Sequence, residues 1–453
     1  MIGLVQRSAQ RTPDHLAVVG ESRSLTYGQL LAEARDVATQ LRSSDAERVA
    51  LAEDDPVRSL IVLVGCAYAG IEVCVLPRAA TDETVLSTAE RLGSTTIVTS
   101  RALETSRVLA TSAVVAKATA GDEPGEPAAD GSVLVLTSGT SSGAPRAARH
   151  LWSRLVAPVE ATRPTPEQRW FLSYGLNQFG GLQVILHVFA AGATLHIPDS
   201  FQPRHAGPLL TRWSITHASG TPTFWRFALL ELVGAALPPL TQITLSGEPV
   251  PAAVLADLRD RFPAAHISQV YAATEFGAAI TVKDGLPGIP EQLLTARDHI
   301  QFEVRNGELW VRSMSSMLGY RDAGSGAAEE DLDWADWRPT GDIVEIIDGR
   351  LQFRGRTSEV INVGGVKVHP VPIEERIASV DGVVVVRVSG RPNPVVGAVV
   401  AAEVVVADGY DPETVIAAIR AACDDLPPSW RPRSIKAVDG LVTTGNKIAR
   451  GAS

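Results

Sequence analysis

The chain has 453 residues, more than one ordinary hydrophobic core accommodates, so we expect two or three packed units. Hydrophobic residues make up 45% and charged residues 20%, which is typical of a globular protein and excludes a disordered chain. The net charge of −10 comes from intermixed acids and bases, and it argues against a nucleic-acid binder, which would carry a basic stripe.

The cysteines and the apolar segments indicate the cellular compartment of the protein. Cys66, Cys74 and Cys423 are odd in number and lack metal-ligand spacing, so we expect a reducing compartment without a disulfide framework. No signal-peptide pattern opens the chain. The most apolar stretch, residues 60–71, stops at Glu72, well short of the roughly 20 residues that a membrane span needs. The sequence therefore predicts a buried helix there, no membrane association and a cytoplasmic protein.

Helical and strand-like patterns alternate along most of the chain. Thr26 and Gln29 form a capping box, and apolar residues between 30 and 41 then fall on one helix face. Residues 132–136 and 243–245 are typical of buried parallel strands that end in Gly/Ser-rich turns. This alternation predicts an α/β fold.

Composition changes mark the boundaries between units. Residues 121–131 form an acidic, Pro/Gly-rich connector, and a second shift comes at 324–333. Beyond Arg356 the chain becomes a Val-rich block, with strands expected at 383–388 and 397–406 and a helix at 412–423. We therefore expect a large domain over 1–356 and a small one over 357–453.

The strongest single motif runs from Val133 to Arg146, where a buried strand leads into hydroxyls and glycines and ends on a cation. Glycines let backbone N–H groups converge on an anion, hydroxyls add donors and arginine adds charge, so a polyphosphate is the expected ligand. The motif is not a Walker A loop, because no Gly-Lys-Ser/Thr follows. A Ser/Gly surface turn is the alternative. The expected phosphate contacts are Thr137, Ser138, Gly139, Thr140 and Ser141.

This loop resembles the T-S-G-[TS]-T-G-x-P-K-G loop of the adenylate-forming superfamily, which comprises acyl-CoA synthetases, adenylation domains and luciferases. Later segments follow in that superfamily's order: 271–275 for Y-G-x-T-E, 307–320 for G-E-L…G-Y, 340–342 for T-G-D, 355–368 for G-R…G-G-x-K-V, and 445–450 for N-G-K-I-x-R with glycine and asparagine exchanged. The motifs cover residues 137–450, and the N-terminal part also looks like the family's first subdomain.

The resemblance implies a fold and a reaction. The fold is a large adenylate-forming domain of packed α/β subdomains with a small β-subdomain, followed by a mobile α+β C-terminal domain. The reaction has two steps: a carboxylate attacks the α-phosphorus of ATP to give acyl-AMP and pyrophosphate, and a thiol of coenzyme A or of a carrier-protein phosphopantetheine arm then displaces AMP. The short chain and residues 217–219 resemble the smaller aryl-type CoA ligases, such as o-succinylbenzoate–CoA ligase.

The resemblance also implies site residues. The catalytic set is Lys447, Arg146, Thr274 and Glu275. Glu275 is the candidate Mg²⁺ ligand, and one carboxylate suffices because Mg²⁺ takes phosphates and water for the rest of its shell. Asp342 and Arg356 are expected at the ribose, and the adenine contacts are Gly247, Glu248, Pro249 and Tyr271.

The C-terminal domain would swing about the segment after Arg356. One orientation presents Lys447 for adenylation, and the other presents the thiol-acceptor residues Gly364, Gly365 and Lys367.

The carboxylic acid substrate is expected to contact Asn177, Gln178, Phe179, Gly181, Thr221, Phe224, Ser246, Ala272 and Ala273. No acidic residue lies between 171 and 195 to pair an α-ammonium, and an unpaired buried ammonium is costly, so an α-amino acid is disfavoured. Aromatic and amide side chains favour an aromatic or short polar acid. The alternative is that these aromatic residues are simply core.

The sequence departs from the family pattern at four positions. Arg146 replaces a lysine, Ala147 and Ala272 replace glycines, and Ser358 stands where Asp or Lys is customary. An arginine-for-lysine exchange is not neutral at a phosphate. Three alternatives stay open: a carrier-protein or amine acceptor, adenylation of another oxyanion, and a non-catalytic nucleotide-binding scaffold.

Overall fold

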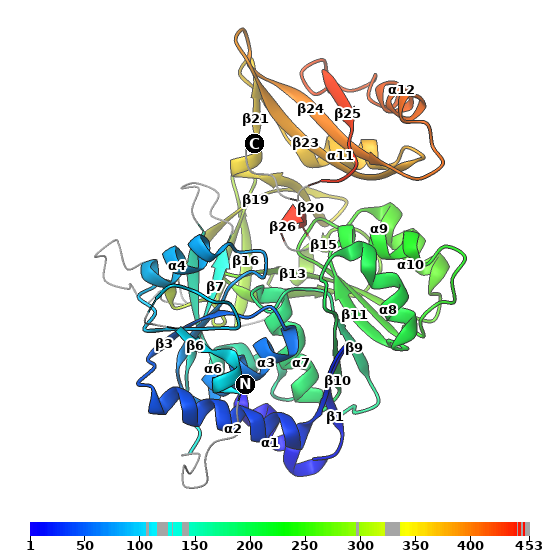
Figure 1. Ribbon diagram of the computed structural model, residues 1–453. Coiled ribbons are helices and arrows are strands. Elements are labelled where there is room, and N and C mark those ends of the chain that lie inside the picture. Colours follow the sequence, from blue (N-terminus) through cyan, green and yellow to red (C-terminus); the bar gives the residue numbers. More distant parts are fainter. Residues whose placement is uncertain are drawn as a thin grey trace.

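The computed structural model describes residues 1–105, 108–115, 126–128, 130–137, 145–295, 299–321, 336–441, 443–444 and 447–448. Two sheets with parallel centres form the body of the protein (Figure 1). The first runs β14 (Gly277–Val282), β13 (His266–Ala273), β12 (Gln242–Ser246), β11 (His217–Gly220), β9 (Arg169–Leu172), β10 (Thr194–Ile197), β1 (Leu16–Gly20) and β2 (Ser24–Thr26). The second runs β18 (Gly319–Arg321), β8 (Arg146–Leu151), β7 (Ser132–Thr137), β4 (Glu72–Val75), β3 (Arg48–Ala52), β5 (Thr96–Thr99) and β6 (Val108–Ala110).

Helices join these two sheets into one core. A single cluster of buried side chains includes residues from both sheets and from α1 (Ile2–Arg11), α2 (Tyr27–Ser43), α3 (Pro56–Ala69) and α7 (Phe179–Ala191). The other α-helices among the described residues of the large part are α4 (Asp82–Arg91), α5 (Thr111–Val114), α6 (Trp152–Val156), α8 (Ala206–Arg212), α9 (Pro222–Glu231) and α10 (Ala252–Arg261). Because α3 is buried over almost its whole length, the predicted buried helix is confirmed.

The start of α2 shows how local sequence sets an element boundary. The Thr26 hydroxyl accepts a hydrogen bond from the Gln29 amide at 3.2 Å, and the Gln29 side chain accepts one from the Thr26 amide at 2.9 Å. These two bonds satisfy donors that the first helical turn would otherwise leave unpaired. The predicted capping box is therefore confirmed.

An antiparallel β-subdomain follows the first sheet. Its strands are β15 (Ile289–Pro290), β20 (Arg350–Arg356), β19 (Arg338–Ile347), β17 (Glu308–Ser313) and β16 (Ile300–Arg305), in that order. Its core includes Phe276 and Ile280 from the β13–β14 segment, so the subdomain packs against the edge of the first sheet.

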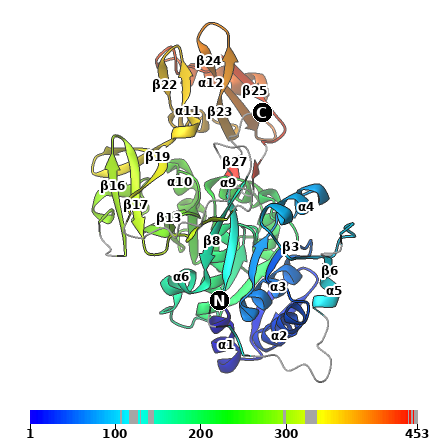
Figure 2. The same ribbon diagram turned by 90° about the vertical axis from the view of Figure 1, so that its left-hand side faces the viewer.

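The C-terminal part has a sheet and core of its own. The sheet contains β22 (Val366–Val368), β21 (Ile361–Val363), β24 (Gly397–Val406), β23 (Val383–Asn393) and β25 (Ser434–Ala437), with α11 (Pro370–Ala378) and α12 (Pro412–Ala422). Two short strands, β26 (Thr443–Thr444) and β27 (Lys447–Ile448), pair near the end of the chain. Figure 2 shows this part standing above the large one.

The predicted fold class is confirmed: the protein is α/β, with a large N-terminal part and a smaller C-terminal one. The strand expected at 383–388 is longer than predicted, because β23 pairs with β24 as far as Asn393. Most of the predicted connector and all of the shift at 324–333 lie outside the described residues. Along the described chain, no helix combines the length and the hydropathy that crossing a bilayer demands.

Candidate active site

The predicted phosphate loop connects two antiparallel strands. β7 ends at Thr137 and β8 begins at Arg146, and these two residues are directly paired. The Thr137 hydroxyl donates to the Arg146 carbonyl at 3.3 Å. Ser138, Gly139, Thr140 and Ser141 lie outside the described residues, so their phosphate contacts stay predictions. The two ends of the loop are nevertheless in place, with the exposed Arg146 at its exit.

The predicted ribose residues form a connected group. Asp342 Oδ1 accepts from Arg356 Nε at 3.1 Å, and Asp342 Oδ2 accepts from the Tyr271 hydroxyl at 2.6 Å. The Tyr271 ring stacks on Phe353, with 5.1 Å between the ring centroids. Gly341 before the aspartate has φ +75°, a conformation that glycine adopts without the cost borne by other residues. The structure thus brings Asp342 and Arg356 together and adds Tyr271, which the motifs assign to the adenine; the ribose and adenine contacts themselves stay predictions.

Burial and charge shift the pKa values of this group. Burial raises the pKa of Tyr271 well above its ordinary value, and the Asp342 carboxylate raises it further. Burial acts to lower the pKa of Arg356, but the negative charges of carboxylates, led by Asp342 and followed by Glu275 and Glu359, outweigh it and raise that pKa. At neutral pH the phenol is therefore a hydrogen-bond donor and the guanidinium a cation.

A second group lies beside the first. The Glu275 carboxylate accepts a hydrogen bond from the Tyr320 hydroxyl at 2.9 Å, and the Arg146 guanidinium carbon lies 3.4 Å from the centroid of the Tyr320 ring. The sequence motifs include Tyr320 but predict no role for it. The positive charge of Arg356 also acts on Tyr320, so the two groups are within electrostatic reach of each other.

Glu275 is suited to bind a metal ion. Its side chain is partly exposed, and Mg²⁺ usually takes one or two carboxylates, with water and phosphate oxygens completing its shell. Among the residues that the structure describes, no group of three or more His, Cys, Asp or Glu side chains comes together to hold a metal. A nucleotide-bound Mg²⁺ does not require such a group, so the residues present fit it.

The candidate adenine loop connects to helix α9. Gly247 adopts φ +87°, and Glu248 Oε2 accepts from the Thr223 amide at 3.1 Å. The Thr221 hydroxyl accepts from the Phe224 amide at 3.0 Å, so both side chains cap the start of α9. These bonds give Glu248 and Thr221 a structural role. Their predicted ligand contacts, and those of Pro249, stay predictions.

The first candidate acid-binding segment is a tight turn before α7. Gln178 Oε1 accepts from the Gly175 amide at 2.8 Å, and the Gln178 amide donates to the Gly175 carbonyl at 3.0 Å. A Cβ on Gly181 would lie 2.3 Å from that same carbonyl oxygen, so the close approach requires glycine. Asn177 and Gln178 are partly exposed, whereas Phe179 is buried in the core between the sheets.

The other candidate acid-binding residues divide between core and strand ends. Phe224 is 1% exposed and packs edge-to-face against Trp225, with ring centroids 5.4 Å apart. Ser246, Ala272 and Ala273 lie at the carboxyl ends of β12 and β13 and are partly exposed. The alternative that the aromatic residues are core thus describes the placement of Phe224, and its predicted contact with the acid stays a prediction.

The thiol-acceptor candidates lie on the hairpin between β21 and β22. Gly364 and Gly365 both have positive φ, at +57° and +88°. The Gly364 amide donates to the Val396 carbonyl at 2.8 Å, and the Gly365 amide donates to Asn362 Oδ1 at 3.0 Å. Lys367 is exposed. The hairpin is therefore well defined on the small domain.

The chain end that carries Lys447 reaches the large domain. The backbone of Lys447 pairs with Thr444, and β27 lies close to α9. Figure 1 shows β26 between the C-terminal sheet and the large domain. The orientation therefore brings the lysine-bearing strand toward the helix whose start contacts Glu248.

The chain is similar to known proteins in both its large and its small part. The family model described as AMP-binding enzyme matches residues 5–321, and the model of the AMP-binding enzyme C-terminal domain matches residues 372–447. A 2-succinylbenzoate–CoA ligase of Bacillus velezensis is 25% identical over 99% of this chain and 96% of its own. A substituted indenyl-propanoyl:CoA ligase of Mycobacterium tuberculosis is 28% identical over 69% of this chain and 63% of its own.

Solved structures agree in fold. The anthranilate–CoA ligase AuaEII, solved in complex with anthranoyl-AMP, has a TM-score of 0.83 with 19% identity, covering 99% of this chain and 95% of its own. Both parts of the present chain, the sheets of the large one and the smaller C-terminal one, are included in that match. The chain belongs to the AMP-binding enzyme family.

Proposed function

We propose that this protein uses ATP to activate a small carboxylic acid as its acyl-AMP and then transfers the acyl group to a thiol, with coenzyme A as the first candidate acceptor. One observation carries the proposal: the group of Tyr271, Asp342 and Arg356 lies within electrostatic reach of the group of Arg146, Tyr320 and Glu275. The first suits ribose hydroxyls and the second suits phosphates.

In the first step the carboxylate oxygen attacks the α-phosphorus, the bond to the β-phosphate oxygen breaks, and pyrophosphate leaves. Two anions approach each other, so cations are the required catalytic parts. Arg146 from the loop exit and Lys447 from the chain end supply them, and Glu275 would hold a nucleotide-bound Mg²⁺. When bound, that ion would neutralise phosphate charge. In the second step a thiol sulfur attacks the acyl carbon and AMP leaves.

The proposed class of carboxylic acid rests on the relatives and on one segment of the sequence. The names of the relatives include CoA ligases for succinylbenzoate and for an indenyl-propanoate, and the segment over residues 171–195 lacks an acid that could pair an α-ammonium. An aromatic or short polar acid therefore remains the proposed class.

The proposal also includes a domain boundary and a cellular location. We place the domain boundary after Arg356, where β20 ends and the C-terminal sheet has not yet begun. We place the protein in the cytoplasm, because Cys66, Cys74 and Cys423 are all unpaired and buried, as suits a reducing compartment.

A pyrophosphate-release assay with a panel of acids tests the first step. Release with an aromatic or short polar acid is the expected result, whereas no release with any acid would favour a non-catalytic scaffold. Coenzyme A, a holo carrier protein or a simple amine is then added separately. Formation of the thioester with coenzyme A is expected, and product with another acceptor alone would reassign the second step.

Substitution Lys447→Ala tests whether this lysine takes part in the adenylation step. The variant should release pyrophosphate at least about 100-fold more slowly, since a cation aimed at developing charge is among the larger catalytic effects. Lys436→Ala, which removes an exposed lysine on β25, is the matched control and should behave as wild type. Equal rates in the two variants would show that Lys447 has no part in adenylation.

A further inference from the structure

Tyr320 connects two residues that the proposed reaction needs. Its hydroxyl donates to Glu275, the candidate metal ligand, and its ring lies under the guanidinium of Arg146, the candidate phosphate contact. Tyr320 comes from a late segment of the chain, 45 residues beyond Glu275. One side chain thus contacts both the metal ligand and the loop cation.

The backbone around Tyr320 is held in place independently of these contacts. In β18, Tyr320 pairs with Ala148 of β8, and the Leu318 amide donates to the Arg149 carbonyl at 2.7 Å. The Met317 amide donates to the Glu275 carbonyl at 3.0 Å. The same short segment therefore fixes both the tyrosine and the backbone of the glutamate.

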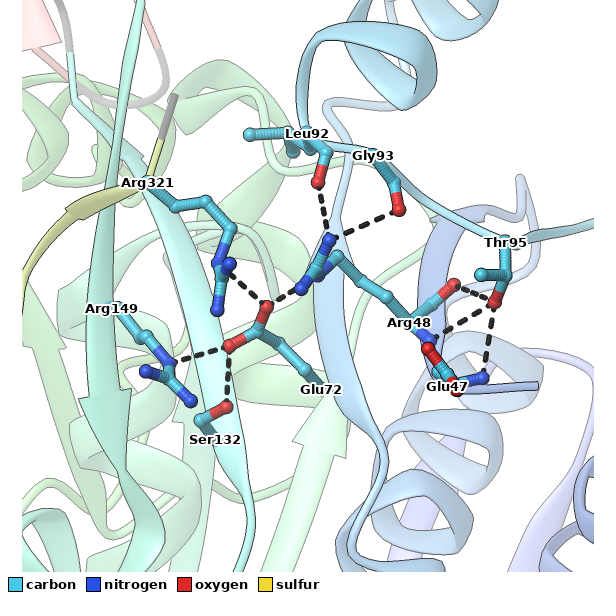
Figure 3. A network of polar contacts seen from close by, with 9 residues as sticks. All are labelled: Glu47, Arg48, Glu72, Leu92, Gly93, Thr95, Ser132, Arg149 and Arg321. Atoms are coloured by element: carbon cyan, nitrogen blue, oxygen red, sulfur yellow. Dashed lines mark hydrogen bonds and ion pairs between the residues drawn. The ribbon is translucent and has the colours of Figure 1, made fainter. Parts of the chain in front are cut away.

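The residue after Tyr320 adds a further anchor. Arg321 lies 3.0 Å from the carboxylate of Glu72, which also contacts Arg48 and Arg149 (Figure 3). Glu72 is 7% exposed and belongs to β4, so this ion-pair cluster ties the edge strand β18 to the centre of the second sheet. Tyr320 is thus held by the sheet and has little freedom to move.

The chemistry of each contact suits a positioning role. The Tyr320 hydroxyl donates to the Glu275 carboxylate at 2.9 Å, a normal hydrogen-bond length. A hydrogen bond to a ligating carboxylate orients that carboxylate toward its metal. A flat guanidinium stacks on an aromatic face with its N–H groups directed outward, whereas an ammonium is a point charge without such a plane.

We propose that Tyr320 is a positioning residue for the ATP-dependent step: its hydroxyl orients Glu275 toward the nucleotide-bound metal ion, and its ring holds the Arg146 guanidinium toward the phosphates. Arginine rather than lysine at position 146 is part of this arrangement, because it can stack on the ring while it presents donors to an anion. The inference rests on the proposed function and deepens it.

Three substitutions test separately the contact of the Tyr320 hydroxyl with Glu275 and the contact of its ring with Arg146. Tyr320→Phe removes the hydroxyl and keeps the ring, Arg146→Lys keeps the charge and removes the stacking plane, and Tyr320→Leu removes both contacts. Pyrophosphate release is measured against Mg²⁺ and ATP concentration, with Tyr410→Phe, an exposed tyrosine of the small domain, as control.

Tyr320→Phe should raise the Mg²⁺ concentration for half-maximal rate about tenfold, since loss of a partner of a metal ligand has effects of that order. Saturating Mg²⁺ should restore its rate, which would not happen if the hydroxyl served only stability. Arg146→Lys should raise the KM for ATP by roughly tenfold. The same exchange in a Tyr320→Leu background should add little.

The outcomes distinguish this inference from the proposed function. An inactive wild-type protein would overturn the proposed function. An active wild type whose Tyr320→Phe variant shows an unchanged Mg²⁺ response would overturn the hydroxyl's role. An Arg146→Lys effect of equal size with and without the Tyr320 ring would overturn the stacking role. Tyr320→Phe removes one oxygen atom, so its test remains valid even if Tyr320→Leu fails to fold.

Discussion

Asp342 already has two protein partners and can still bind a ribose. Each carboxylate oxygen has two lone pairs, and Tyr271 and Arg356 each occupy a site on a different oxygen. Accepting capacity therefore remains on both oxygens. The hydrogen bonds from Tyr271 and Arg356 fix the orientation of the Asp342 carboxylate before a ligand binds. Less side-chain entropy is therefore lost on binding.

His150 on β8 is a buried polar residue beside the active-site segment. Its side chain is fully buried against Phe179, with ring centroids 5.4 Å apart, and within the described part of the chain neither ring nitrogen makes a close hydrogen bond. Burial lowers the pKa of His150 to about 4; the backbone of Thr274 opposes this shift and the positive charge of Arg154 adds to it. The folded protein therefore holds this imidazole neutral well below the pH at which a free histidine takes up its proton.

This lowered pKa predicts a pH dependence of stability. Below the ordinary pKa of 6.5 the unfolded chain binds a proton at His150 that the folded chain does not, until the pH nears 4. Stability should therefore fall as the pH drops through this window, by about 1.4 kcal/mol per pH unit for one such histidine. His196 and His217, with pKa values of about 4, add to the same trend.

Substitution His150→Leu isolates the contribution of one residue. Thermal unfolding is followed between pH 7 and pH 5, and the variant should lose less Tm than wild type over that range. At pH 7 the variant should be about as stable as wild type, because leucine fills a buried site without the cost of burying an imidazole. A Tm loss equal to that of wild type would show that His150 does not cause the dependence.

At the scale of elements, the Glu72 cluster joins strands from distant parts of the chain. The carboxylate contacts Arg48 at the start of β3, Arg149 on β8 and Arg321 on β18, and it accepts from Ser132 at the start of β7 at 2.7 Å (Figure 3). Burial acts to raise the pKa of Glu72, but the Ser132 hydrogen bond and the arginine charges outweigh it and lower that pKa. The Glu72 carboxylate is therefore ionised, and each of its two oxygens contacts at least one arginine.

Substitution Glu72→Ala should lower the free energy of unfolding by about 3–5 kcal/mol, because removing one partner of a buried ion pair leaves charges uncompensated. Denaturant titration measures the loss. Glu303→Ala provides a matched control, since Glu303 makes an exposed pair with Arg305 and its removal should change stability little. Similar losses in both variants would contradict the structural role given to the cluster.

At the scale of the whole molecule, Arg226 connects the two domains. It lies on α9 of the large domain, and Nη1 donates to the carbonyl of Val384 on β23 of the small domain at 3.2 Å. Burial lowers the pKa of Arg226, although the charges of Glu248, Asp257 and Glu374 oppose that shift. The same helix lies close to β27, so Arg226 supports the orientation that brings the chain end to the large domain.

Substitution Arg226→Ala should therefore slow pyrophosphate release about tenfold, from the loss of one hydrogen bond to a charged group. Transfer from preformed acyl-AMP to the thiol should change less, because that step would use another orientation of the small domain. The two steps are assayed separately, with Arg212→Ala on the exposed side of α8 as control. An equal change in both steps would show that Arg226 does not favour one orientation.

Sequence alone determined the features that depend on neighbouring residues. The capping box at Thr26, the buried strands that became β7 and β12, and the order of motifs along the chain all follow from local periodicity, turn chemistry and spacing. These features predicted the family and the α/β fold. They did not predict the end of β23, because the length of that strand is set by its pairing with β24.

Tertiary structure decided which distant side chains meet. The contact of Tyr271 with Asp342 spans 71 residues, and that of Arg226 with Val384 spans 158. The partners of Tyr320 and the placement of Phe224 in the core were likewise open in the sequence. Such contacts depend on how sheets and helices pack in three dimensions, and a pattern that describes each element separately carries no information about packing between them.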